Sequence, residues 1–389
     1  MAWTFLEKTA EYGTQSKQNT QKRKIIHLLF HHQELSIPEL CQFLKLSVPT
    51  GTKLVEEFEN HGMLVKAGKR ESSGGRRPVA YRLGPNMGYV IGIELVSHAF
   101  KLGIVNLQRE LVYEYETETF DISDKNAALD FLKHIVPQIV ANQNIPPEKI
   151  LGAGIGITGR VDHKKGISYS YLNLEQPLAS HLQVEWGFPV FIDNDTHLLA
   201  WGENSFGLAR AKKNAICVNL SRGLAVSLIS NGQLHNGHSG FAGEFGHIFA
   251  ADNKRACACG KKGCLETLVS GLALESAYAT QTGEKLPYKK ILNLVEHGQP
   301  QVTETLHHMG EQLGRSLAVL VDLLNPELIV LSGGFVPVFE TMRYSIIRGI
   351  SLYSLPQLAS DCEIKVSTLG ENAGVMGAYA MAFEQVLAP

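Results

Sequence analysis

Three cysteines fall within eight residues, in the stretch Cys257-Ala-Cys259-Gly-Lys-Lys-Gly-Cys264, and His247 precedes them by ten residues. Three thiolates and one imidazole complete the tetrahedral ligand set of a structural zinc ion, and the glycines let the loop fold back so that the sulfurs converge. Because no ligand position is left open for water, the sequence predicts a structural Zn²⁺ ion here. Unligated core cysteines and a redox switch are the alternatives.

Cysteine usage and charge also indicate the compartment. Six cysteines in 389 residues are too few and too clustered for the disulfide framework of a secreted protein. Glu7, Lys8 and Glu11 lie where a signal peptide needs an apolar core, and no run of about 18 apolar residues predicts a membrane helix. With 44% hydrophobic residues and a net charge of -2, the expected protein is cytoplasmic, has two or three domains and does not insert into a membrane.

Charge is unevenly distributed along the chain. Residues 1–85 carry 13 Lys and Arg against 8 Asp and Glu, a net charge of +5, whereas the remainder carries -7. A basic N-terminal region on an acidic remainder indicates that only this region meets a polyanion. Ordinary surface variation is the alternative.

This basic region has the order of elements of a winged helix-turn-helix. Ser36 and Ser47 lie at N-cap positions, and a proline follows each of them in the first helical turn. The second helix is expected to bury Leu40, Phe43 and Leu44. Helices are expected over 22–31, 36–44 and 48–60, and strands over 63–65 and 79–83, with a basic, Gly-rich wing between the strands.

The polar start of the third helix and the wing predict the contacts with double-stranded operator DNA, since the second helix of such a pair enters the major groove. The residues expected to contact DNA are Ser47, Thr50, Thr52, Lys53, Lys69, Arg70, Arg76 and Arg77. A three-helix protein-interaction module with a solvated basic loop is the alternative.

The other 300 or so residues alternate short apolar strands with amphipathic helices, which predicts an α/β architecture of two lobes. Strands are expected at 89–94, 101–106, 150–157, 189–192, 215–220, 225–230 and 328–331, and helices near 126–142, 196–206, 264–279, 301–324 and 372–386. The predicted domains are 1–85, a first lobe over 86–195 and a second lobe over 196–371, with the C-terminal helix 372–389 packing back on the first lobe.

Two further clusters carry chemistry. Glu244, His247 and Glu266 place carboxylates beside an imidazole, and such groups can hold vicinal hydroxyls, which both donate and accept hydrogen bonds. His247 could bind zinc through one nitrogen and present the other to a ligand. Asn194 and Asp195 follow an apolar strand, where a carboxylate and an amide can meet a ligand. Ordinary surface acids and turn chemistry are the alternatives.

These motifs resemble those of the ROK family (repressors, open reading frames and kinases) over essentially the whole chain. The similar stretches are Gly154-Ile-Gly156-Ile-Thr-Gly159-Arg-Val-Asp162, Asn194-Asp195, Glu244-Phe-Gly-His247 and the cysteine loop through Glu266. The resemblance implies an actin-like sugar-kinase fold and a sugar pocket between the lobes, lined by Gly159, Asn194, Asp195, Glu244, His247 and Glu266. In the kinases, the residue matching Asp195 is the general base.

The phosphate-binding motifs of those kinases are altered here. The first reads Gly92-Ile-Glu94-Leu-Val96-Ser97-His98, where the kinases have Gly-x-Asp-x-Gly-Gly-Thr. The second reads Ser221-Arg222-Gly223-Leu-Ala225 and keeps only its middle glycine, although Arg222 could still attract an anion. Side chains in place of glycine remove the close backbone approach on which phosphate positioning depends. Ser332-Gly333-Gly334, similar to the adenosine-side turn, remains.

The residues implied to bind sugar are intact, whereas the phosphate-binding motifs are altered. This combination predicts a sugar-responsive transcriptional regulator, most simply a repressor, and not an enzyme. A symmetric operator requires at least a homodimer, and a homotetramer is equally compatible. The first alternative is an active ROK sugar kinase with a DNA-binding head. The second is a repressor controlled by sequestration onto a sugar-transport protein.

Overall fold

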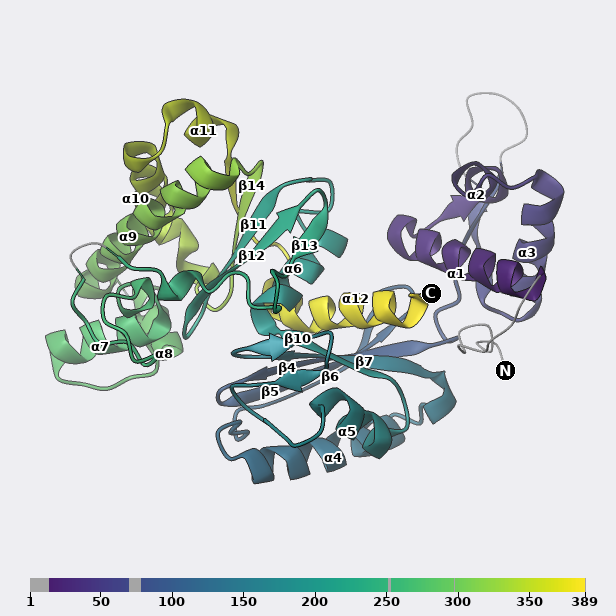
Figure 1. Cartoon of the computed structure of the whole chain (residues 1–389), viewed down its shortest axis with the longest axis horizontal. Coiled ribbons are helices and arrows are strands. Elements are labelled where there is room, and N and C mark those ends of the chain that lie inside the picture. The colour runs from purple at the N-terminus through teal and green to yellow at the C-terminus, as the bar shows by residue number, and fades with distance from the viewer. Residues whose placement is uncertain (1–13, 70–77, 251–252, 297, 389) are drawn as a thin grey trace. The chain divides into compact units, whose positions relative to one another are not determined.

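Figure 1 shows the computed structural model, which describes residues 14–69, 78–250, 253–296 and 298–388. The chain forms two compact units. The first unit holds Met1–Ile157, Gly166–Ile192 and Ala378–Pro389, and the second holds Thr158–Lys165 and Asp193–Gly377. Within the described part of the chain, no helix is both long and apolar enough to cross a membrane.

The first unit begins with three helices and a three-stranded antiparallel sheet in the order β1-β3-β2. Its elements are α1 (Thr14–His32), β1 (Leu35–Ser36), α2 (Ile37–Leu44), α3 (Val48–Asn60), β2 (Leu64–Lys69) and β3 (Val79–Leu83). This arrangement confirms the predicted winged helix-turn-helix, with a longer first helix than expected. Most of the predicted wing, residues 70–77, lies outside the described residues.

Serine caps and one close contact fix the helix-turn-helix. The Ser36 hydroxyl accepts a hydrogen bond from the backbone N–H of Glu39, whose carboxylate accepts one from the Ser36 N–H at 2.7 Å. The Ser47 hydroxyl accepts from the N–H of Thr50 at the start of α3, so both predicted caps are confirmed. Gly51 lies against α2, because a Cβ atom there would be 2.3 Å from Sγ of Cys41.

The prediction that Phe43 is buried was wrong. Phe43 is 52% exposed and Leu44 is half-buried, whereas Leu40 and Cys41 form the inner face of α2. The helix has only eight residues, and the contact with Gly51 turns Cys41 inward. Two positions further on, about 200° around the helix, Phe43 therefore faces outward.

The rest of the first unit is built on a five-stranded sheet of order β10-β7-β4-β5-β6. β4 pairs with β7 in parallel and with β5 antiparallel, and β5 pairs with β6 antiparallel. Its elements are β4 (Tyr89–Val96), β5 (Ala99–Asn106), β6 (Leu111–Thr117), α4 (Lys125–Asn142), β7 (Ile150–Ile157), α5 (Leu178–Trp186) and β10 (Val190–Asn194). β6 was not predicted, because its apolar residues alternate with acids along an edge strand.

The last helix, α12 (Ala373–Leu387), packs against this sheet from Ala378 onward. A Cβ atom on Gly154 would lie 2.1 Å from the carbonyl oxygen of Ala378, so glycine is needed where the helix crosses β7. The buried hydroxyl of Tyr379 donates a hydrogen bond to the carbonyl of Asn106 at 3.0 Å. Residues far apart in the sequence therefore share one core.

The second unit contains a five-stranded sheet of order β13-β12-β11-β14-β15, covered by helices. β11, β14 and β15 are parallel, and β12 and β13 are antiparallel to their neighbours. Its strands are β11 (Ala215–Leu220), β12 (Leu224–Ser230), β13 (Gln233–His235), β14 (Leu328–Ser332) and β15 (Glu363–Val366). Its helices are α6 (Asp195–Ser205), α7 (Gly271–Thr282), α8 (Tyr288–Glu296), α9 (Pro300–Leu324), α10 (Phe339–Tyr353) and α11 (Pro356–Asp361).

The predicted helix over 264–279 was wrong in its first turn. Leu265–Thr267 is a short 3-10 turn, and α7 begins only at Gly271. The Ser270 hydroxyl accepts from the N–H of Ala273 at 3.0 Å and so fixes the start of the helix. This late start leaves Cys264 directly before the 3-10 turn and Glu266 within it.

Candidate functional site

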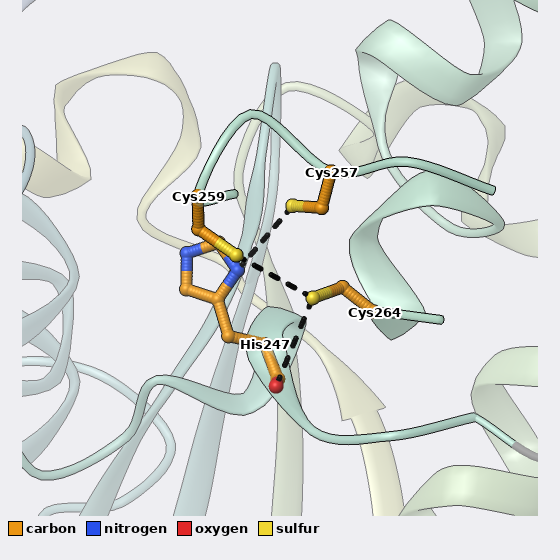
Figure 2. Close-up of side chains that lie close together, drawn as sticks. All are labelled: His247, Cys257, Cys259 and Cys264. Carbon is orange, nitrogen blue, oxygen red and sulfur yellow. Dashed lines mark hydrogen bonds between the residues drawn. The ribbon is translucent and has the colours of Figure 1, made fainter. Parts of the chain in front are cut away.

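Figure 2 shows His247 surrounded by the three cysteines of the 257–264 loop. The ligand atoms of His247, Cys257, Cys259 and Cys264 all lie within 4.8 Å of one another. Nδ1 of His247 is 3.8 Å from Sγ of Cys257, and Sγ of Cys259 is 3.6 Å from Sγ of Cys264. A tetrahedron with metal–sulfur bonds of about 2.3 Å has edges of ~3.8 Å, so the four residues fit a zinc ion.

The backbone of the loop explains this convergence. Gly260 and Gly263 have φ angles of 88° and 85°, in the left-handed region that glycine adopts without strain. The N–H of Lys261 lowers the pKa of the Cys259 thiol, whereas burial raises that of Cys264 to about 12. A bound cation would offset the second effect, because it favours the thiolate.

The second nitrogen of His247 points away from the sulfurs. Its Nε2 atom is 3.8 Å from the Glu244 carboxylate, while Nδ1 faces Cys257. Glu244 itself is exposed. One imidazole thus joins the thiol cluster to a solvent-accessible carboxylate, which is the geometry in which a metal on Nδ1 would orient the ring.

Asn194 and Asp195 lie where β10 meets α6. Asn194 caps α6, its Oδ1 accepting from the N–H of Thr196 at 2.9 Å, and its Nδ2 donates to the carbonyl of Gly159 at 2.8 Å. Asp195 also accepts from the Thr196 N–H. Burial raises the pKa of Asp195 to about 6, and the negative charge of Glu244 adds to this increase.

Glu266 faces the turn between β11 and β12. Its Oε2 accepts from the N–H of Leu224 at 3.2 Å, and a Cβ atom on Gly223 would be only 2.7 Å from that oxygen. A Cβ atom on Gly246 would lie 3.2 Å from Cβ of Glu266. The glycine kept in the second phosphate motif thus makes room for Glu266.

A chain of contacts therefore brings together all the residues that were expected to bind sugar, and all of them belong to the second unit. Asn194 donates a hydrogen bond to Gly159, and His247 lies 3.8 Å from the Glu244 carboxylate. The negative charge of Glu244 raises the pKa of Asp195, and Glu266 lies beside Gly246. The set offers carboxylate, amide and imidazole groups, which can accept from and donate to hydroxyls.

His197 was missed from the sequence. Its Nδ1 lies 2.8 Å from Asp193, both side chains are only 2% exposed, and its Nε2 lies 3.2 Å from the carbonyl of Ala242. Burial lowers the pKa of His197, but the hydrogen bond and charge of Asp193 outweigh that and leave it raised. His197 thus ties α6 to the segment before Glu244, and its spacing of four residues from Asp193 was the available signal.

The predicted DNA-contacting residues of α3 are accessible. Thr50 and Lys53 are exposed and Thr52 is half-buried. The Ser47 hydroxyl is 2.8 Å from that of Thr50, so both hydroxyls are hydrogen-bonded to each other at the start of α3. Lys69 ends β2, and Arg70, Arg76 and Arg77 lie outside the described residues.

A model of the ROK family matches residues 90–385. The chain is 27% identical over 372 residues to the xylose repressor of Bacillus subtilis, covering 94% of this chain and 95% of the repressor. It is 27% identical over 307 residues to the glucokinase of Halalkalibacterium halodurans, covering 74% of this chain and 93% of the kinase.

Solved structures agree on the fold. A ROK family transcriptional regulator, a homologue of the E. coli MLC protein, has a TM-score of 0.80 at 22% identity and covers 96% of this chain and 97% of its own. A ROK glucokinase from Streptomyces griseus, solved with glucose and AMPPNP, has a TM-score of 0.65 at 25% identity and covers 76% of this chain and all of its own (100%). The predicted fold class is confirmed, and since the family model spans most of the sequence, the chain belongs to the ROK family.

Proposed function

We propose that this protein is a sugar-responsive transcriptional repressor of carbohydrate uptake or catabolism genes. The observation that carries the proposal is the union, in one chain, of a winged helix-turn-helix with a hydroxyl-binding cluster of carboxylates around His247. The similarity to repressors supports it, because it extends over 94% of this chain, whereas the glucokinase match covers 74%.

In this proposal residues 1–85 bind double-stranded operator DNA, and residues 86–389 form the effector domain. A small sugar bound by Gly159, Asn194, Asp195, Glu244, His247 and Glu266 changes the population of lobe arrangements and hence the spacing of paired DNA-binding heads. Xylose is the first ligand to test, because relatives are xylose repressors.

A structural Zn²⁺ ion held by His247 and the three cysteines supports the same cluster. When bound, the metal supplies rigid tetrahedral coordination and no reaction chemistry. His247 then holds a fixed orientation toward Glu244, so the zinc loop and the effector site are coupled through one side chain.

Phosphoryl transfer is disfavoured by the residues at the former phosphate loops. Val96 pairs with Ala99 in a regular hairpin, and His98 is exposed at its turn. The Ser221 hydroxyl donates to Asn219 at 2.7 Å and accepts from the N–H of Gly334 at 3.0 Å. The Ser221 hydroxyl of the second motif is therefore already engaged by protein groups on both sides.

DNA binding is tested with operators selected from random duplexes by the full-length protein. Lys53→Ala is expected to weaken binding about tenfold and to reduce the salt slope by ~1, because one phosphate contact is lost. Fluorescence anisotropy at several salt concentrations measures both. Lys125→Ala, an exposed lysine at the start of α4, is the control and should bind as wild type. Equal binding by all three proteins would contradict the DNA-contacting role of α3.

The effector is tested by adding sugars to the protein–operator complex. A free sugar should release the DNA, and ATP-Mg should not. Turnover of ATP with a hexose, abolished by Asp195→Asn, would instead establish the kinase. If no pentose, hexose or sugar phosphate releases the DNA, control by a sugar-transport protein is favoured. A pull-down without sugar would detect that protein.

Self-association is the remaining part of the proposal. Large apolar side chains are exposed along α9 and α10, namely Val319, Leu323, Tyr344, Leu352 and Tyr353. Arg315 of α9 lies over the ring of Tyr353 of α10 at 4.9 Å, and this contact connects the exposed surfaces of the two helices. A second copy is the occupant we favour, because a symmetric operator needs two heads.

A charged side chain on this exposed apolar surface of α9 and α10 should separate the subunits. Leu323→Glu is expected to shift the protein to monomer in multi-angle light scattering, since a buried carboxylate without a partner is costly. Val184→Glu is the matched control, because Val184 is 84% exposed on α5 of the other unit. An unchanged mass for Leu323→Glu would exclude this surface from the interface.

A further inference from the structure

A second group of metal-ligating side chains lies in the first unit, separate from the thiol cluster. His27 and His31 are one turn apart on α1, and Glu384 lies on α12. Their ligand atoms are all within 4.8 Å of one another. Nε2 of His27 is 3.1 Å from one carboxylate oxygen of Glu384, and Nε2 of His31 is 2.6 Å from the other.

The two helices that carry these residues are packed together. Phe30 on α1 stacks on Phe383 of α12 with ring centroids 4.1 Å apart and planes 19° apart. Arg23, one turn before His27, donates to the carbonyl of Ala388 at 2.8 Å. Apolar stacking and a backbone contact thus hold the three side chains close together without a metal, which lowers the entropy cost of binding one.

We propose that His27, His31 and Glu384 bind a divalent transition-metal ion that joins α1 of the winged helix-turn-helix to α12. Two imidazoles and one carboxylate are suitable ligands for Zn²⁺, Co²⁺ or Ni²⁺, and three protein ligands leave a position for water. The side chains are 46%, 33% and 20% exposed, so an ion reaches them from solvent.

The charges within the cluster act on its two kinds of ligand in opposite ways. The hydrogen bond and charge of Glu384 raise the pKa of His27 in spite of its burial. Burial raises the pKa of Glu384, but the hydrogen bonds to His27 and His31 outweigh it and hold that pKa at about 2. The carboxylate is therefore available as an anionic ligand, whereas the raised pKa of His27 opposes binding, because a metal must displace the proton from that imidazole.

Metal binding would strengthen the contact between the DNA-binding head and α12. An effect of this contact on operator affinity rests on the proposed function, whereas the metal site itself follows from the geometry. A metal-binding measurement therefore tests the site even if the chain binds no DNA.

The experiment uses the untagged, full-length protein. One equivalent of zinc is added first, which the thiolate cluster takes up, and Co²⁺ is then titrated while the visible spectrum is recorded. We expect one further equivalent of Co²⁺ to bind with d–d bands of nitrogen and oxygen coordination and without sulfur-to-cobalt charge transfer. Charge-transfer bands throughout would place all the cobalt on thiolates and overturn the proposal.

Variants identify the ligands. Glu384→Gln and His31→Gln should each bind Co²⁺ at least about tenfold more weakly, since loss of even an outer-shell partner costs that much. His134→Gln is the matched control, because His134 also has a carboxylate four residues away, Asp130, but lacks a third ligand nearby among the described residues. Wild-type affinity in both ligand variants would show that the cluster is only a hydrogen-bonded contact.

X-ray absorption at the cobalt edge, on wild-type protein loaded first with one equivalent of zinc and then with cobalt, needs no variant and covers the case in which a variant fails to fold. The expected spectrum contains imidazole scattering and no sulfur. Sulfur in the first coordination shell would overturn the proposal.

Discussion

Replacing Cys257 and Cys264 together by serine is expected to abolish zinc binding at the thiol cluster and to lower the free energy of unfolding of the second unit by ~3 kcal/mol or more. Both side chains are buried, and apart from its own turns the loop is held by a few contacts, such as the hydrogen bond from the Ala250 N–H to the Gly263 carbonyl at 2.8 Å. Without the metal, the thiol cluster loses its largest stabilising interaction. Metal content per chain and urea unfolding measure the two effects.

The control for this change is Cys362→Ser. Cys362 is half-buried at the end of α11 and lies outside the thiol cluster, so its variant should keep zinc and stability. The double variant should also lose its sugar response, since His247 is shared with the effector cluster. Full zinc content and an unchanged response in the double variant would refute both the ligand set and the coupling.

Asp195→Asn is expected to stabilise the protein while abolishing its response to sugar. Burial raises the pKa of Asp195 from its usual 3.8 to about 6, so the ionised side chain destabilises the folded state above pH 6. At 1.36 kcal/mol for each pKa unit, this cost is roughly 1–3 kcal/mol at pH 8. It falls away as the pH drops through 6 toward 3.8, because the folded protein then binds the proton. The asparagine removes the charge and keeps the oxygen that accepts from Thr196.

Thermal unfolding at pH 8 and pH 4 measures this difference, and sugar-induced thermal shifts measure the response. Asp162→Asn, in the same unit, is the control, for which we expect the opposite change in stability at pH 8. Burial raises the pKa of Asp162, but hydrogen bonds from Lys165 outweigh it and leave the pKa lowered. That variant should lose a little stability at pH 8. Destabilisation by Asp195→Asn at pH 8 would contradict the assigned cost of the charge, and a retained sugar response would contradict its role as a ligand.

Local patterns predicted much of the fold. Ser36 and Ser47 identified helix starts, because a cap is set by residues three positions apart. Apolar runs identified β4, β7 and β14, whose residues are almost entirely buried. The edge strand β6 was missed, because its alternation of Tyr and Glu reflects solvent on one face and carries no strong apolar signal.

The sequence by itself determined which side chains form the candidate metal cluster, since three of its four members fall within eight residues and two glycines make the loop turn. It also determined the head, whose helices are set by caps and short turns. Only the tertiary structure decided that the charge of Glu244 raises the pKa of Asp195 and that His197 pairs with Asp193 inside the core. The same is true of the contact between His27 and Glu384, which are 357 residues apart. Spacing along the chain fixes geometry within one turn or loop. Contacts between distant segments instead depend on how whole sheets and helices pack, and no local pattern encodes that packing.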